Sequence, residues 1–207
     1  MMKSIGNVMK KVALPFALAG LAVFNMPVVA AEKVNLVKPK SFNQHTPRII
    51  NGKPATQGDY PFMTSLISAQ AEGISPFCGA SFIGGRYVLT ASHCIEGSAA
   101  ENMHVWIGGY DTTKPESGKR VSVAQIYEHE NYGDIGLNND IAIIELTEEV
   151  TGVTPIKLIT PEIEAILKDG SELTVMGWGN MNPNSEAAPE YPEILQEVKV
   201  PLYNREQ

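Results

Sequence analysis

His93 is the first residue of this sequence whose surroundings would allow chemistry. It lies in residues 90–94, Thr-Ala-Ser-His-Cys, directly after an apolar run, and its small neighbours leave room around the imidazole ring. A catalytic histidine needs such room, a fixed tautomer and a partner carboxylate. Taken alone, a histidine in this position is more often a structural hydrogen-bonding residue, so the residue types leave both roles open.

Asp140 is the candidate partner of that histidine. It opens the segment of residues 141–146, which is apolar except for Glu145. Burying a bare carboxylate beside such a run costs on the order of several kcal/mol unless the carboxylate is hydrogen-bonded or paired. A histidine N–H is one such partner, and a turn-capping role for the aspartate is the alternative.

A third candidate is a proteolytic cleavage site between Arg48 and Ile49. Residues 32–48 are polar and basic, contain two prolines and show no hydrophobic periodicity, which predicts a flexible linker or propeptide. The arginine stands where this linker meets the folded body. An accidental Arg-Ile pair is the alternative.

Residues 1–31 predict a secretory signal peptide. Three lysines precede an apolar run over residues 12–24, and small residues then offer cleavage after Ala30 or Ala31. The run is too short for a stable membrane span, so we expect a secreted protein, extracellular or periplasmic, with no membrane span in the mature chain. A buried helix is the alternative.

The chain contains two cysteines, Cys78 and Cys94. Export makes a disulfide between them permissible. The bond would close a loop of about 16 residues and contribute about 3 kcal/mol on the chain-entropy model. Two free thiols are the alternative, and two cysteines alone cannot form a structural zinc site.

These side chains need a scaffold, and the sequence predicts one made of short strands. Hydrophobic residues make up 43% of the 207 residues, and 18 glycines and 14 prolines punctuate them. Apolar or alternating segments between the turns predict an all-β barrel or sandwich. The segment 141–146 is apolar except for Glu145, and we expect a strand covered on both faces. The expected strands are residues 62–67, 77–83, 87–90, 104–107, 121–127, 141–146, 172–176 and 197–202.

The charge distribution excludes several classes of partner. Residues 1–48 hold seven of the 16 Lys/Arg and one of the 23 Asp/Glu, which leaves 9 basic and 22 acidic residues in the body and a net charge of −13 there. Such a body lacks the basic surface that nucleic acid or an anionic membrane requires. We expect neither as a partner, and we expect no cofactor.

Five short motifs, taken together and in order, resemble the trypsin/chymotrypsin-like serine proteases. The agreement runs from residue 48 to about residue 203, and Ser92 replaces the alanine that is usual before the histidine. The motifs are residues 48–52 (RIING, the activation site), 78–81 (CGAS), 90–94 (TASHC, the histidine motif), 139–142 (NDIA, the aspartate motif) and 176–179 (MGWG, the start of the second barrel).

The resemblance implies a role for each candidate residue. His93 would be the general base and later the general acid, and Asp140 would hold its productive tautomer and stabilise the imidazolium, as in the family's triad. Cys78 and Cys94 would form the disulfide of the first barrel. Cleavage after Arg48 would let the new terminus at Ile49 fold inward onto an aspartate next to the nucleophile.

The resemblance also implies two six-stranded β-barrels with the active site between them. We expect an N-terminal barrel over residues 49–157 that carries the histidine and the aspartate, and an incomplete start of the C-terminal barrel over residues 158–207. The first barrel would thus be complete and the second only partly present.

The family's Gly-Asp-Ser-Gly-Gly motif does not occur in these 207 residues. Ser171 and Ser185 lie in the wrong contexts, so we expect the sequence to stop before the nucleophilic serine and the polypeptide to be inactive alone. Leu173 stands where many relatives have a cysteine. The segment 109–119 lacks the paired acids of the family's calcium loop, so calcium binding is not expected.

The sequence therefore predicts a fragment of a serine endopeptidase zymogen. Its substrates would be proteins or peptides, and its activator would be a trypsin-like protease, which could be the enzyme itself. The alternative is a non-catalytic protease-like binding module. A metal site built from His93, His104 and His129 has no support, because no His-x-x-x-His or Cys-x-x-Cys spacing occurs.

Overall fold

The computed structural model describes residues 49–133, 138–184 and 186–203. The chain divides into two units, Met1–Asn43 and Gln44–Gln207, and every described residue belongs to the second. The predicted signal peptide, the predicted propeptide and Arg48 lie outside the described residues.

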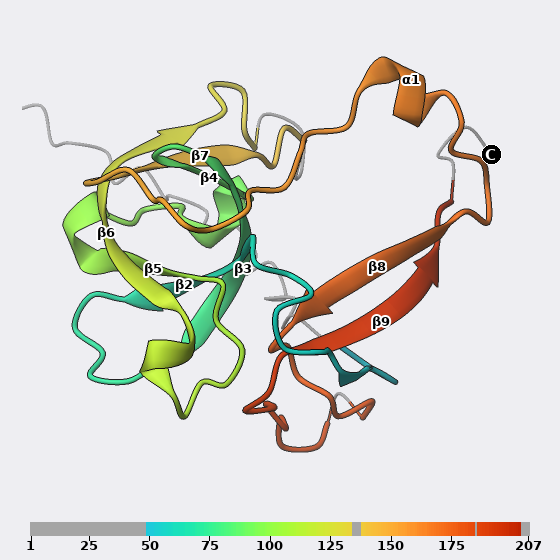
Figure 1. The fold of residues 1–207 in the computed structure, drawn as a ribbon, viewed down its shortest axis with the longest axis horizontal. Coiled ribbons are helices and arrows are strands. Elements are labelled where there is room, and N and C mark those ends of the chain that lie inside the picture. The colour runs from blue at the N-terminus through green and yellow to red at the C-terminus, as the bar shows by residue number, and fades with distance from the viewer. Residues whose placement is uncertain (1–48, 134–137, 185, 204–207) are drawn as a thin grey trace, which may run out of the picture. The chain divides into compact units, whose positions relative to one another are not determined.

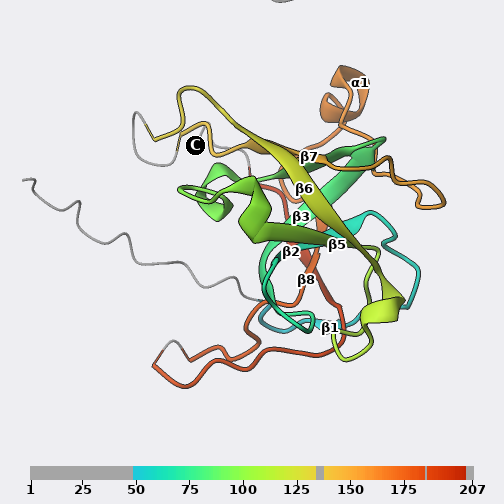
Figure 2. The same cartoon turned by 90° about the vertical axis from the view of Figure 1, so that its left-hand side faces the viewer.

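Six antiparallel strands close into a barrel in the order β2-β3-β4-β7-β6-β5 (Figures 1 and 2). Each strand coincides, within one or two residues at each end, with a segment that the sequence predicts as a strand. The predicted barrel is therefore confirmed. Its strands are β2 (Met63–Ser68), β3 (Pro76–Gly84), β4 (Tyr87–Thr90), β5 (Met103–Ile107), β6 (Lys119–Glu128) and β7 (Ala142–Leu146).

A second, three-stranded sheet has the order β1-β9-β8, and Figure 1 shows β8 and β9 side by side. The predicted strands β8 (Glu172–Gly177) and β9 (Gln196–Pro201) are both present. The short β1 (Lys53–Pro54) was not predicted, and it pairs with β9 rather than with the barrel strands that follow it. Within the part of the chain that the structure describes, helix is limited to one turn of α1 (Pro161–Glu164) and three short 3-10 segments, Ser92–Cys94, Ala100–Asn102 and Pro115–Ser117. The fold is all-β.

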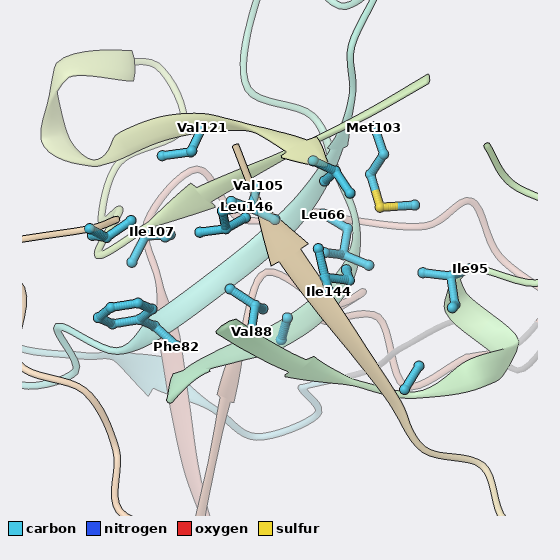
Figure 3. Close-up of a cluster of buried hydrophobic side chains, with 14 residues drawn as sticks. Leu66, Phe82, Val88, Ile95, Met103, Val105, Ile107, Val121, Ile144 and Leu146 are labelled. Carbon is cyan, nitrogen blue, oxygen red and sulfur yellow. The ribbon is translucent and has the colours of Figure 1, made fainter. Parts of the chain in front are cut away.

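The interior of the barrel is filled by aliphatic side chains from all six strands. Leu66, Val88, Val105 and Ile144 are completely buried there and point toward one another (Figure 3). Alternate residues of a strand face the same side, so each strand supplies every second side chain to this core.

The apolar strand β7 follows the same alternation, contrary to the sequence-based expectation that it is covered on both faces. Ala142, Ile144 and Leu146 are buried, whereas Ile143 is only half-buried and Ile141, just before the strand, is 47% exposed. The barrel interior needs only one face of the strand, and the side chains of the other face, Ile143 and Glu145, stay half-buried.

Trp106 of β5 joins the barrel to the second sheet. It is fully buried, and its ring centroid lies 5.5 Å from that of Trp178, which directly follows β8. Its Nε1 donates to the carbonyl oxygen of Pro115 at 3.0 Å. The loop after β5 packs closely against the ring. A Cβ added at Gly109 of this loop would lie 2.3 Å from a ring carbon.

Arg120 of β6 fixes the connection between β2 and β3. Its guanidinium donates to the carbonyl oxygens of Ser68, Ala69 and Ala71 at 3.0–3.3 Å. Its Nε donates to Nδ1 of His104 at 2.8 Å. Burial and the neighbouring guanidinium lower the pKa of His104, so the ring stays neutral and can accept this hydrogen bond.

Substitution of Gly109 by alanine tests the packing around Trp106. We expect Gly109→Ala to lower the free energy of unfolding by about 1–3 kcal/mol, because the added methyl group overlaps the indole ring. Gly73→Ala is the matched control, since no atom lies within 4 Å of its added Cβ, and its effect should stay within about 0.5 kcal/mol. Urea unfolding followed by circular dichroism measures both. Equal stabilities for the two variants would contradict this account of the packing.

Candidate functional site

His93 lies on the surface of the barrel, three residues after the end of β4. The hydroxyl of Thr90, the last residue of β4, donates to the carbonyl oxygen of Gly79 at 2.9 Å, and the chain then turns through the 3-10 segment Ser92–Cys94. Ser92 is buried, and its hydroxyl donates to the carbonyl oxygen of Ile141 at 2.7 Å. The serine that replaces the family's usual alanine thus joins the histidine turn to the segment that carries Asp140.

His93 and Asp140 lie in direct contact. Nδ1 of His93 is 2.7 Å from Oδ2 of Asp140, and the backbone N–H of His93 donates to Oδ1 at 2.8 Å. Both carboxylate oxygens therefore accept from the same residue. A proton on Nδ1 satisfies the carboxylate and leaves the lone pair of Nε2 free, on a side chain that is 51% exposed.

The surroundings of Asp140 keep its carboxylate ionised. Partial burial opposes ionisation, but the hydrogen bonds from the backbone and ring of His93 outweigh it and lower the pKa of Asp140. The turn before it is held by Asn139, which has a φ of +58° and whose Nδ2 donates to the carbonyl oxygen of Asn131 at 3.0 Å. Asparagine is one of the few residues that adopt a positive φ readily, so this position could have been recognised from the sequence.

The disulfide between Cys78 and Cys94 is present, as predicted, with Cα atoms 6.0 Å apart. It links β3 to the turn that carries His93. Sγ of Cys94 lies 3.5 Å from Nε2 of the histidine ring. No sequence pattern predicts this contact between Cys94 and Nε2, because it depends on how the turn folds back.

Ile49, the residue that would follow the predicted cleavage site, is buried. Its backbone N–H donates to the carbonyl oxygen of Asn180 at 3.1 Å, and its side chain lies against Gly52, where an added Cβ would be 2.4 Å from Cγ2. The amide oxygen of Asn180 accepts from two further backbone N–H groups of the loop after β8. Sequence reasoning missed Asn180, since no local pattern connects it to a segment about 130 residues earlier.

A hollow of about 740 Å³ opens beside the same isoleucine. It lies between β3 and β8, on the side of the disulfide, and His93 does not line it. Its walls are Ile49, Met63, residues 74–79, Thr112, residues 175–179 and residues 191–193.

The other sequence candidates lie apart from His93. The hydroxyl of Ser171 accepts from the backbone N–H of Lys168 within its own turn, and Ser185 lies outside the described residues. His104 is held by Arg120, and Nδ1 of His129 accepts from a backbone N–H two residues away. The three histidines of the considered metal site are therefore not brought together.

Within the described ranges, one group of three potential metal ligands occurs. The Sγ atoms of Cys78 and Cys94 and a ring nitrogen of His93 lie within 4.8 Å of one another. In the segment 109–119, the carboxylate of Asp111 is engaged by Thr113 and Lys114.

The chain is similar to several trypsins. Residues 49–207 match the family model described as Trypsin. Trypsin Blo t 3 of Blomia tropicalis is 36% identical over 160 residues, which are 76% of this chain and 56% of that protein. Trypsin 5G1 of Aedes aegypti is 32% identical over 163 residues, covering 77% of this chain and 57% of the mosquito protein. The chain thus spans little more than half the length of these relatives.

Solved structures agree with the sequence comparison. The VesB protease of Vibrio cholerae matches with a TM-score of 0.65 and 38% identity, over 75% of this chain and 45% of the solved chain. The secreted serine protease VesC of the same organism matches with a TM-score of 0.64 and 31% identity, over 74% and 31% of the two chains.

No helix among residues 49–133, 138–184 and 186–203 is long and apolar enough to cross a membrane. Three findings indicate one family. They are the closed six-stranded barrel, the disulfide beside a paired histidine and aspartate, and the family match over residues 49–207. The chain belongs to the trypsin family of serine proteases.

Proposed function

We propose that this chain is part of a secreted serine endopeptidase zymogen, with His93 and Asp140 as two members of its catalytic triad. The observation that carries the proposal is the contact of 2.7 Å between Nδ1 of His93 and Oδ2 of Asp140, on a fold of the trypsin family. The substrates are proteins or peptides. The disulfide and the secreted relative VesC support export.

In the proposed reaction each residue of the pair has its own step. The carboxylate of Asp140 fixes the tautomer with the proton on Nδ1, so Nε2 of His93 can take a proton from a nucleophilic hydroxyl. The imidazolium that forms keeps its contact with the carboxylate and then gives the Nε2 proton to the leaving amine. A serine hydroxyl and oxyanion donors must complete the reaction, and the 207 residues contain no Gly-Asp-Ser-Gly-Gly motif to supply them.

We further propose that cleavage after Arg48 activates the complete protein. Ile49 is already buried, and its N–H donates to the carbonyl oxygen of Asn180. Cleavage would convert this amide into an ammonium group, which is costly to bury without a carboxylate. The family's aspartate beside the nucleophile would supply that charge.

The 207-residue polypeptide itself should be inert. Without a nucleophile beside Nε2 no acyl-enzyme can form, so we expect no cleavage of a peptide amide substrate and no covalent labelling by a fluorophosphonate. Bovine trypsin under the same conditions is the positive control. Labelling of a residue in this polypeptide would refute the assignment of the nucleophile to a segment beyond these 207 residues.

The complete reading frame that contains these residues should encode an active enzyme. In that product we expect Asp140→Asn to lower kcat by about 10⁴-fold at neutral pH, because the amide favours the wrong tautomer of the histidine. Glu145→Gln, on the strand β7 that follows Asp140, is the control, since the Glu145 carboxylate accepts a hydrogen bond from Tyr127 on the barrel surface. An inactive complete product with the pair intact would instead favour a non-catalytic binding module.

Activation should require Arg48. We expect limited trypsin treatment of the complete product to yield a chain that begins Ile-Ile-Asn-Gly, and Arg48→Gln to block both this cut and the rise in activity. Lys53→Gln is the control for loss of a nearby basic residue. N-terminal sequencing and intact mass measure the cut, and full activity of uncleaved Arg48→Gln would contradict the proposed activation.

A further inference from the structure

Cys78, Cys94 and His93 form a cluster of three potential metal ligands. The proposed catalytic cycle uses His93 but neither sulfur. Cys78 and Cys94 are half-buried, and His93 is exposed, so the cluster can be reached from solvent. In the disulfide the two sulfurs are bonded to each other and cannot act as thiolate ligands. Reduction would free both of them beside the unprotonated Nε2 of the histidine.

The distance between Nε2 of His93 and Sγ of Cys94 matches a tetrahedral zinc site, whereas the two sulfurs, bonded to each other in the disulfide, must move apart on reduction. Zinc binds thiolate sulfur at about 2.3 Å and imidazole nitrogen at about 2.0–2.1 Å. Tetrahedral angles then place a sulfur and a nitrogen ligand about 3.6 Å apart. The observed distance between Nε2 of His93 and Sγ of Cys94 is 3.5 Å, and all three ligand atoms lie within 4.8 Å of one another.

Asp140 supplies the support that a zinc-bound histidine usually has. Such a histidine binds the metal through one ring nitrogen and donates its other N–H to a carboxylate, which fixes the ring and raises its basicity. Nδ1 of His93 already lies 2.7 Å from Oδ2 of Asp140, with Nε2 directed toward Cys94. The orientation that suits a general base therefore also suits a metal ligand.

We propose that reduction of the Cys78–Cys94 disulfide converts this cluster into a Zn²⁺ site, with the two thiolates and Nε2 of His93 as protein ligands and water in the fourth position. The reductant is a dithiol, which passes two electrons to the disulfide and leaves as its own cyclic disulfide. Zn²⁺ then displaces the two thiol protons, which go to solvent, and takes the lone pair of Nε2.

Metal binding and proteolysis would then exclude each other. The lone pair that the proposed general base needs is the one that the metal takes, so the reduced, zinc-bound protein could not accept a proton from a nucleophile. This consequence rests on the proposed catalytic role of His93. The metal site rests only on the positions of the three ligands and is tested without any activity measurement.

Cobalt(II) provides the test, because it replaces zinc in tetrahedral sites and absorbs light when thiolates bind it. The 207-residue chain is reduced with a dithiol, freed of reductant without oxygen and titrated with Co²⁺. We expect one Co²⁺ per chain, a sulfur-to-cobalt charge-transfer band and tetrahedral d–d bands that Zn²⁺ abolishes. The oxidised chain should show none of these.

Two variants distinguish Co²⁺ binding at the folded site from Co²⁺ binding by the two thiols of an unfolded chain. Asp140→Asn should weaken Co²⁺ binding about 10–100-fold, and His93→Ala should weaken it further because a ligand is lost. His129→Ala, which removes an exposed histidine held in its own turn, should bind Co²⁺ like the unchanged chain. Circular dichroism of each reduced sample reports whether the barrel persists.

Two outcomes would overturn the proposal. One is reduced chain that binds no Co²⁺. The other is Co²⁺ binding with the same affinity in His93→Ala and Asp140→Asn as in the unchanged chain, which is what an unfolded dithiol would show. Neither outcome bears on proteolysis by the oxidised, complete product, so the metal site and the proposed function can fail separately.

Discussion

The need to pair the carboxylate of Asp140 constrains the segments that form the candidate site. Partial burial makes an isolated charge costly, and the structure meets this cost with two hydrogen bonds from one residue, through the backbone N–H and the ring of His93. The histidine turn, the end of β4 and the segment before β7 must then meet at one point. The hydroxyl of buried Ser92 reinforces the same junction by donating to the carbonyl oxygen of Ile141.

The disulfide also holds the histidine turn in place. It holds the turn of His93 against β3 through Cys78 and Cys94. The ring is thus oriented by a carboxylate at Nδ1 and bordered by a sulfur near Nε2. Its two nitrogens lie in very different chemical environments, which is the property on which both the proposed catalysis and the proposed metal site depend.

Sequence patterns predicted the strands well because the barrel needs alternation on one face, and residues 121–123 show it directly. A register shift between Val123 and Gln125 then reverses the faces, so that Tyr127 is exposed and Ile126 packs on the core. The largely apolar run 141–146 was misleading, although Glu145 within it lies on the face that is only half-buried. The pairing of β1 with β9 and the contact between Ile49 and Asn180 could not be predicted, because they join segments more than 125 residues apart. Residue types alone suggested His93 and Asp140 as partners but left other roles open, and only the ordered motifs favoured the pair. The contact of Nε2 with Cys94 needed coordinates.

The packing of Trp106 on Trp178 also has an optical consequence. These are the only two tryptophans in the sequence, and one lies in the barrel while the other follows β8 of the second sheet. Because the two indoles lie 5.5 Å apart, the tryptophan fluorescence of the protein reports on a single place, the junction of the two sheets. Any event that separates the second sheet from the barrel, even with both intact, should change the emission without any added label.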